Sequence, residues 1–303
     1  MRDIRKLPAS AGAQWLLDTF SLYRRAPLQL AVLGIIGMLV SSLMFALAQA
    51  LPSWIGIVVQ MLWLASGPIV FGGMLWAVRE IDEGRRALPG HLLQPMLNHR
   101  VSHLVLPFAI QLFALAALFA LLVLLIGRDG LKVASEAFIK SQELQLAGAA
   151  PNSEAVLALW DPVPVKRILL WFGLVIATVF ALSMAMFTQP ALVMLDRQNG
   201  IHALRMSLQG CIENFGAMTV FMLLGLVAST CISFLTVIVM QVGLLIGGPA
   251  AASAIQLLVM TTVMMPLYVG AVYAAWKQMF AHRAGSTPPP VPPSNGPKKI
   301  FAA

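Results

Sequence analysis

The sequence predicts an all-α polytopic membrane protein with six transmembrane helices, and three observations lead to this fold class. The 303-residue chain is 59% hydrophobic and 11% charged, with a mean hydropathy of +0.84, whereas a soluble domain carries about 25% charged residues. Its hydrophobic residues form long unbroken runs rather than the ~10-residue alternating segments of a transmembrane β-barrel. Its basic residues are unevenly divided between the loops that separate these runs. The composition excludes a soluble monomer.

The stretches without Asp, Glu, Lys or Arg give the number of spans. They contain 53, 27, 28 and 63 residues and begin after Arg25, Arg100, Arg167 and Glu213. Because about 20 residues cross the hydrocarbon core as a helix, the two shorter stretches hold one span each and the longer ones two. Each long stretch has a breaker near its middle, Leu51-Pro52-Ser53 or Gly247-Gly248-Pro249. The predicted spans are 28–50, 54–77, 102–126, 167–194, 216–242 and 252–275.

The rest of the chain divides around this six-span domain, 28–283. Residues 1–27 form a cytoplasmic amphipathic segment, 127–166 an outer loop with one short helix, and 284–303 a Pro-rich tail expected to be disordered. A cleaved signal peptide is the alternative for the N-terminus, since Ala48-Gln49-Ala50 resembles a cleavage site. The apolar run before it, about 20 residues, exceeds the 7–15 of a signal peptide, which favours retention.

The basic residues predict the orientation. Fifteen of the 20 lysines and arginines lie on the side that holds both termini, so both termini are expected in the cytoplasm. Six tryptophans fall near predicted membrane boundaries, as in an aromatic belt, and Trp63 lies in the middle of a span. The boundary tryptophans are Trp15, Trp54, Trp76, Trp160, Trp171 and Trp276.

A threefold pattern runs through the predicted domain. Amphipathic segments precede each pair of spans, at 10–25, 92–103 and 201–215. In the first, Leu16, Phe20 and Tyr23 form the apolar stripe. In the third, the stripe consists of Ile201, Leu204, Leu208, Cys211 or Ile212, and Phe215. Pro68, Pro190 and Pro266 fall in the cytoplasmic halves of the even-numbered spans, where proline kinks a helix. Three repeats of an interfacial helix and a hairpin are predicted; the alternative is that prolines are simply common in membrane helices.

The predicted spans offer only neutral polar groups for chemistry. No Asp, Glu, Lys or Arg lies in their central parts, which argues against a carboxylate relay. Gln60, Gln189 and Gln256 are candidates for a polar path, or else for hydrogen bonds between helices. Cys211 and Cys231 are twenty residues apart and cannot pair.

The remaining candidates lie outside the spans. Two histidines four residues apart, His99 and His103, lie near His91, but a zinc site needs a third or fourth ligand. An enzyme would require these histidines to converge with a carboxylate such as Glu83, so no enzymatic activity, metal or cofactor is expected.

The cytoplasmic cations indicate lipid rather than nucleic acid as their partner. Arg24, Arg25, Arg85 and Arg86 flank predicted spans, where each basic residue near anionic phospholipids contributes about 1 kcal/mol. No nucleic-acid binding is expected.

Two motifs carry a resemblance to a known family. The first runs from Pro8 to Leu17 and continues with Arg24, Arg25 and Pro27, and the second runs from Pro190 to Phe215. Together they resemble a family of uncharacterised multi-pass inner-membrane proteins from proteobacteria. The resemblance implies a bacterial inner-membrane setting and supplies no catalytic residues.

Two functional hypotheses follow from the sequence. The first is a non-enzymatic scaffold or accessory subunit that contacts lipid, another membrane protein or a second copy of itself. The second is a passive transporter or channel for a neutral or amphipathic solute. An exposed apolar groove would favour the first, and a water-accessible cavity that converges on Gln60, Gln189 or Gln256 would favour the second.

Overall fold

The computed structural model describes residues 4–148, 150–151 and 153–280, and every regular element among them is a helix. Five helical segments are long and apolar enough to cross a membrane. They are Pro27–Ala50, Ser53–Asp82, Val101–Leu146, Val165–Met194 and Phe215–Met279. The predicted tail, 284–303, lies outside the described residues.

The first hairpin consists of α2, Pro27–Ala50, and α3, Ser53–Asp82. Leu51 and Pro52 join them at the predicted breaker. Gly56 packs so closely on α2 that an added Cβ would lie 2.5 Å from the Ala48 carbonyl oxygen. The first span agrees with its prediction of 28–50, and α3 extends beyond the predicted 54–77 and passes through Pro68 as a helix.

The second hairpin pairs α5, Val101–Leu146, with α7, Val165–Phe187. Gly127 has φ 75° and ψ 163°, which interrupts α5 next to the predicted end of the span. Beyond it the sequence predicts a largely irregular outer loop, but the structure continues as a helix to Leu146 and adds α6, Glu154–Ala158. Glycine accepts this positive φ, so the first helix ends at Gly127 and a second helix begins directly after it in a new direction.

The predicted fourth span, 167–194, is not continuous. It breaks at Thr188, and the short helix α8, Gln189–Met194, follows. Pro190 lies at the start of α8; its ring nitrogen has no hydrogen to donate to the carbonyl four residues earlier, and its ring clashes with that carbonyl.

The third hairpin is the segment Phe215–Met279, folded back on itself at the predicted glycine pair. α10, Phe215–Val259, is interrupted at Gly248, with φ 68° and ψ −163°. The arms lie side by side, because a Cβ on Gly243 would come within 2.4 Å of Ile255. A π-helical turn, Met260–Met264, leads into α11, Met265–Met279.

Proline also explains a contact beside this π-helical turn. Pro266 cannot donate to the carbonyl of Thr262 four residues earlier. That carbonyl instead accepts a hydrogen bond from the Tyr23 hydroxyl at 3.0 Å. The proline therefore frees a backbone acceptor that fastens the N-terminal helix to the third hairpin.

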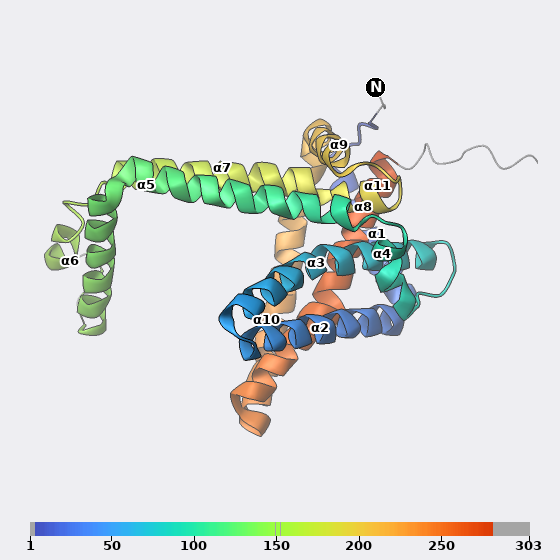
Figure 1. Ribbon diagram of the computed structural model, residues 1–303, viewed down its shortest axis with the longest axis horizontal. Coiled ribbons are helices and arrows are strands. Elements are labelled where there is room, and N and C mark those ends of the chain that lie inside the picture. The colour runs from blue at the N-terminus through green and yellow to red at the C-terminus, as the bar shows by residue number, and fades with distance from the viewer. Residues whose placement is uncertain (1–3, 149, 152, 281–303) are drawn as a thin grey trace, which may run out of the picture.

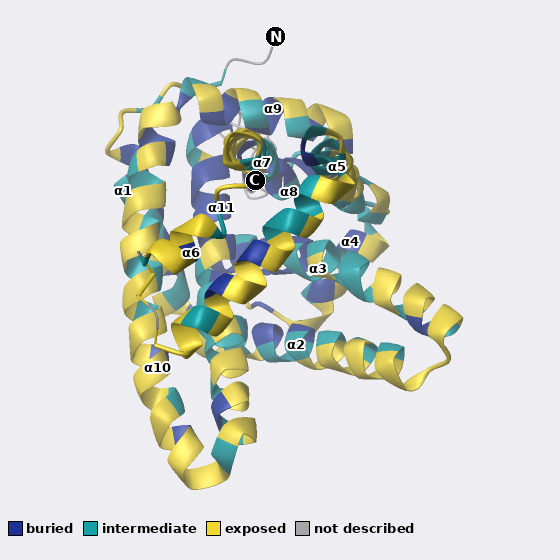
Figure 2. Cartoon of the chain, turned by 90° about the vertical axis from the view of Figure 1, so that its left-hand side faces the viewer, coloured by how far each residue is buried: buried dark blue, intermediate teal, exposed yellow. Residues whose placement is uncertain are grey.

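The inner ends of the three hairpins meet, whereas their outer parts diverge (Figure 1). The α10–α11 hairpin runs across the direction of α5 and α7, and the turned view shows the α2–α3 hairpin leaving in a third direction (Figure 2). Most outer helical surface is exposed in Figure 2. In the apolar windows of the five segments only 6–22% of residues are buried.

The buried residues concentrate where the hairpins meet, in a region that we call the hub. It comprises α1, Ala11–Arg25, α8, α9, Gly200–Glu213, and the ends of α3 and α11 that pack on them. Trp15, Met74, Leu75, Leu192 and Met279 are among its fully buried side chains. Burial of large apolar side chains contributes about 1.5–3 kcal/mol each, so the hub holds the fold together.

The face that α1 buries in the hub differs from its predicted apolar stripe. Its buried face contains Trp15, Thr19 and Leu22, while Phe20 is exposed and Leu16 is half-buried. Small residues explain the difference: a Cβ on Gly270 of α11 would lie 2.9 Å from the Thr19 side chain. The face of α1 that packs in the hub is therefore the one that allows close backbone approach, rather than the more hydrophobic one.

The same correction applies to α9. Of the predicted stripe, Cys211 is buried, whereas Ile201, Leu204, Leu208 and Phe215 are exposed or half-buried. The rest of the buried face contains Ala203, Met206, Ser207 and Gly210. The weak helix predicted over 92–103 is replaced by a 3₁₀ turn, Pro89–Leu93, the short α4, Gln94–Leu97, and the start of α5.

Two tryptophans assigned to the aromatic belt belong to the hub. Trp15 is 0% exposed and donates to Gln278 at 3.0 Å, and Trp276 is 6% exposed and donates to Asp196 at 3.1 Å. Trp54, in contrast, is 73% exposed at the start of α3, as a belt residue would be. A position near a charged loop in the sequence therefore does not distinguish a tryptophan buried in the hub from one in an aromatic belt.

Candidate functional site

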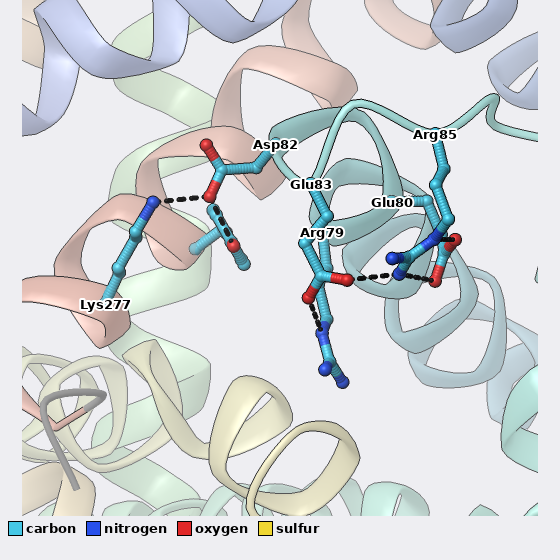
Figure 3. Close-up of polar contacts among 7 residues, drawn as sticks. Arg79, Glu80, Asp82, Glu83, Arg85 and Lys277 are labelled. Atoms are coloured by element: carbon cyan, nitrogen blue, oxygen red, sulfur yellow. Dashed lines mark hydrogen bonds and ion pairs between the residues drawn. The ribbon is translucent and has the colours of Figure 1, made fainter. Parts of the chain in front are cut away.

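The most polar part of the hub lies where α1, α3 and α11 end together, around Asp82 (Figure 3). The Asp82 carboxylate accepts hydrogen bonds from the Tyr273 hydroxyl at 2.8 Å and from the Lys277 ammonium group. Arg25 lies 3.9 Å from its other oxygen. One carboxylate thus joins the ends of all three helices.

A second ion-pair cluster follows at the end of α3 and is also drawn in Figure 3. Arg79 pairs with Glu83 at 2.6 Å, and Arg85 bonds to both Glu83 and Glu80. Partial burial alone would raise the pKa of Glu83, but the hydrogen bonds from Arg79 and Arg85 outweigh it and lower the pKa. The bonds to Glu80 and Glu83 in turn raise the pKa of Arg85.

A cavity of about 270 Å³ lies beside Asp82, lined by residues of α1, α3 and α11. Asp18 lines it and accepts hydrogen bonds from Gln278 at 3.1 Å and Gln14 at 2.9 Å. Gln278 in turn accepts from Trp15. These bonds form a chain from the hub interior to its polar edge and are used to join helices.

The break between α7 and α8 holds the most buried polar cluster. Ser207 accepts hydrogen bonds from the backbone and the hydroxyl of Thr188, both at 3.0 Å, and donates to Met184 O at 3.0 Å. Gln189, 2% exposed, donates to His103 O at 3.0 Å. Burial raises the pKa of Cys211 to about 12, so its thiol is a poor nucleophile at neutral pH.

The three predicted glutamines do not form one site. Gln189 is buried in the hub, whereas Gln60 and Gln256 are exposed on α3 and α10. The hydrogen bond to His103 gives Gln189 a structural role rather than a place on an open path.

The cation candidates do share one region. Arg24 and Arg25 directly precede α2, and the Ala87 N–H donates to Gln29 of α2 at 2.9 Å, which brings Arg86 beside the same helix end. Arg85 is engaged by Glu80 and Glu83, while Arg24 and Arg86 are exposed and have no ion pair within the described ranges. The latter two are the better candidates for lipid contact.

Two clefts that sequence reasoning missed lie where α11 meets its neighbours. A cleft of about 310 Å³ between α5, α7 and α11 is lined by Gln111, Thr178, Ser183 and Tyr268. An apolar groove of about 350 Å³ between α1, α10 and α11 also includes Tyr268. Gln111 was visible as an intramembrane glutamine, but only the fold brings it to hydroxyls from two other helices.

The fold does not bring His91, His99 and His103 together as a metal or enzymatic site would require. His91 accepts from the Leu88 N–H at 3.2 Å, and His99 stands alone at a positive φ of 52°. Within the part of the chain that the structure describes, no three His, Cys, Asp or Glu side chains gather as a metal site. Cys211 and Cys231 are both free, as predicted.

Comparison of the chain with known protein families, with characterised proteins and with solved structures finds no match. The resemblance to an uncharacterised proteobacterial family therefore stays a prediction. By helix length and hydropathy, the chain is a multi-pass helical membrane protein.

Proposed function

We propose that this protein is a non-enzymatic scaffold of the bacterial inner membrane that contacts lipid or another membrane protein. The observation that carries the proposal is the division between the hub and the hairpins. The polar groups of the hub join its own helices, while the apolar hairpin surfaces stay exposed to bind lipid or protein.

The proposal includes six membrane crossings with both termini in the cytoplasm. The reversal at Gly248 divides Phe215–Met279 into two apolar arms, each long enough for the ~30 Å core. The asymmetry of 15 basic residues to five supports the orientation. The three hairpins, which diverge from the hub, would have to align more closely along one membrane normal.

The lipid-contacting part of the proposal rests on Arg24 and Arg86, two exposed arginines that have no ion pair within the described residues. Arg24 and Arg86 lie together at the start of α2, where a cytoplasmic orientation places them among anionic headgroups. Anionic phospholipid is expected to stay bound when the protein is released from membranes for native mass spectrometry. Retention should fall with Arg24→Gln plus Arg86→Gln and stay unchanged with Arg205→Gln, an exposed cation on α9.

A liposome-swelling experiment tests the scaffold against the passive transporter. Purified protein is reconstituted, and the swelling rate is measured with glycerol and urea as neutral solutes. The scaffold predicts rates equal to those of empty liposomes. A rate that rises with the amount of reconstituted protein would reject the proposal.

A further inference from the structure

The cleft between α5, α7 and α11 brings together four neutral polar side chains from separate helices. Gln111 comes from α5, Thr178 and Ser183 from α7, and Tyr268 from α11. None of the four side chains has a hydrogen-bond partner within residues 4–148, 150–151 and 153–280. Other hydroxyls in the spans, such as those of Ser229, bond back to their own helix.

Three of the four groups lie at a similar distance from the charged helix ends, and Thr178 lies five residues before Ser183 on α7, farther from the charged end. Gln111 is 11 residues from Arg100, Ser183 is 13 from Asp196, and Tyr268 is nine from Lys277. At 1.5 Å per helical residue these separations are about 14–20 Å. In a bilayer whose core is about 30 Å thick, this places the groups within the hydrocarbon, where an unpaired polar group is costly.

The apolar groove shares the lining residue Tyr268 with this cleft. Leu16 and Phe20 of α1 form one wall, Phe221 and Leu226 of α10 the other, and α11 the floor. Leu16 and Phe20, which belong to the apolar stripe predicted for α1, here line a groove. A polar cleft and an apolar groove that share one residue fit an amphipathic molecule.

No charged residue lines either the cleft or the groove. A charged headgroup would lose its hydration there without gaining a countercharge, which disfavours phospholipids. The amide and hydroxyls both donate and accept hydrogen bonds. They fit a headgroup that contains a hydroxyl group together with carbonyl oxygens.

We infer that the cleft and groove bind one neutral glycerolipid of the diacylglycerol class. Its hydroxyl and ester carbonyls bond to Gln111, Thr178, Ser183 and Tyr268, and one acyl chain lies in the groove. This inference rests on the proposed lipid-contacting scaffold and names a lipid distinct from the anionic lipid at Arg24 and Arg86.

The test uses the full chain in lipid nanodiscs with a diacylglycerol that carries a photoactivatable group in one acyl chain. Crosslinks are expected on α1 and α10 beside Phe20 and Leu226, and unlabelled diacylglycerol should compete. Gln111→Leu should weaken apparent affinity by about tenfold and Tyr268→Phe by about threefold, the effect of one or two lost hydrogen bonds. The matched control is Gln256→Leu, because this exposed glutamine lines neither cavity.

A groove-filling variant tests the acyl-chain position independently. Gly225 lines the groove, and an added Cβ there meets no atom within 4 Å, so Gly225→Leu fills space without a backbone clash. Crosslinking should fall at least fivefold. Gly173→Leu, at an open position outside both cavities, is the control and should crosslink as the parent does.

Three results would overturn the inference: crosslinks spread evenly over the hairpins, equal loss with Gln256→Leu, or competition by anionic phospholipid at the same concentration as diacylglycerol. Competition by free glycerol alone would also overturn it, because it would identify a polyol site that does not use the groove. The proposed scaffold survives each of these results, whereas solute flux in the swelling experiment would reject it.

Discussion

The hub and the outer parts of the hairpins both contain tryptophans and glycines, but these residues have opposite surroundings in the two regions. Trp15 in the hub is fully buried, whereas Trp54 at the tip of the first hairpin is 73% exposed. Glycines differ likewise: a Cβ on Gly12 would lie 2.1 Å from the Ala217 carbonyl oxygen, whereas Gly173 has open space. Hydrophobicity alone therefore does not indicate which residues hold this fold together; close packing does.

The largest expected effect is the loss of the central tryptophan. Trp15→Ala should lower the free energy of unfolding by about 3–5 kcal/mol, since it empties a packed site and leaves Gln278 without its donor. Thermal unfolding in mild detergent measures the change. Trp54→Ala should leave the stability within about 0.5 kcal/mol of the parent. Equal losses of stability at Trp15 and Trp54 would contradict the claim that the hub, and not the outer hairpins, holds the fold together.

A smaller effect is expected where helices approach each other through glycine. Gly12→Ala should destabilise by about 1–3 kcal/mol, because α1 must move away from the backbone of α10. Gly173→Ala should be neutral or slightly stabilising, since alanine favours helix by about 1 kcal/mol. The same unfolding assay compares the two, and a harmless Gly12→Ala would contradict the close contact.

The hydrogen bonds and ion pairs around Asp82, which we call the Asp82 junction, should contribute less to the free energy of unfolding than the apolar core of the hub. Asp82→Asn weakens the bonds from Tyr273 and Lys277 and should cost about 1–2 kcal/mol. Asp129→Asn, at an exposed position in the second hairpin, is the control and should leave stability unchanged. An Asp82 variant as stable as this control would show that the junction does not join the helices.

The smallest effect concerns pH. Because the pKa of Glu83 is lowered in the folded chain, its charge stabilises the fold above the ordinary carboxyl pKa, and this contribution is lost as the pH falls through the lowered value. Glu83→Gln should therefore be slightly less stable than the parent at pH 7, by less than about 1 kcal/mol for so exposed a pair. The difference should shrink as the pH falls below the ordinary carboxyl pKa; a difference that stays constant from pH 7 through this acidic range would contradict the assignment.

The sequence predicted the helical class and the turns well because charge and helix breakers are local signals. Leu51-Pro52 and Gly248 lie at reversals, and Gly127 marks the end of the third predicted span. It did not predict which faces are buried, since Thr19 is polar but packs on Gly270 while the hydrophobic Phe20 is exposed. The convergence of Gln111 with Tyr268 depends on contacts between distant segments, which no local pattern contains.

Spin labelling in lipid bilayers tests the central claim, that exposed apolar hairpins lie in lipid while a buried hub joins them. Labels at Val58, Phe119 and Leu235, all more than half exposed, are placed one at a time in a Cys231→Ser background. A fourth label replaces the buried Ala203. The account predicts high oxygen and low nickel-chelate collision rates at the hairpin sites, and low rates of both at Ala203. Strong nickel collisions at the three hairpin positions would contradict it.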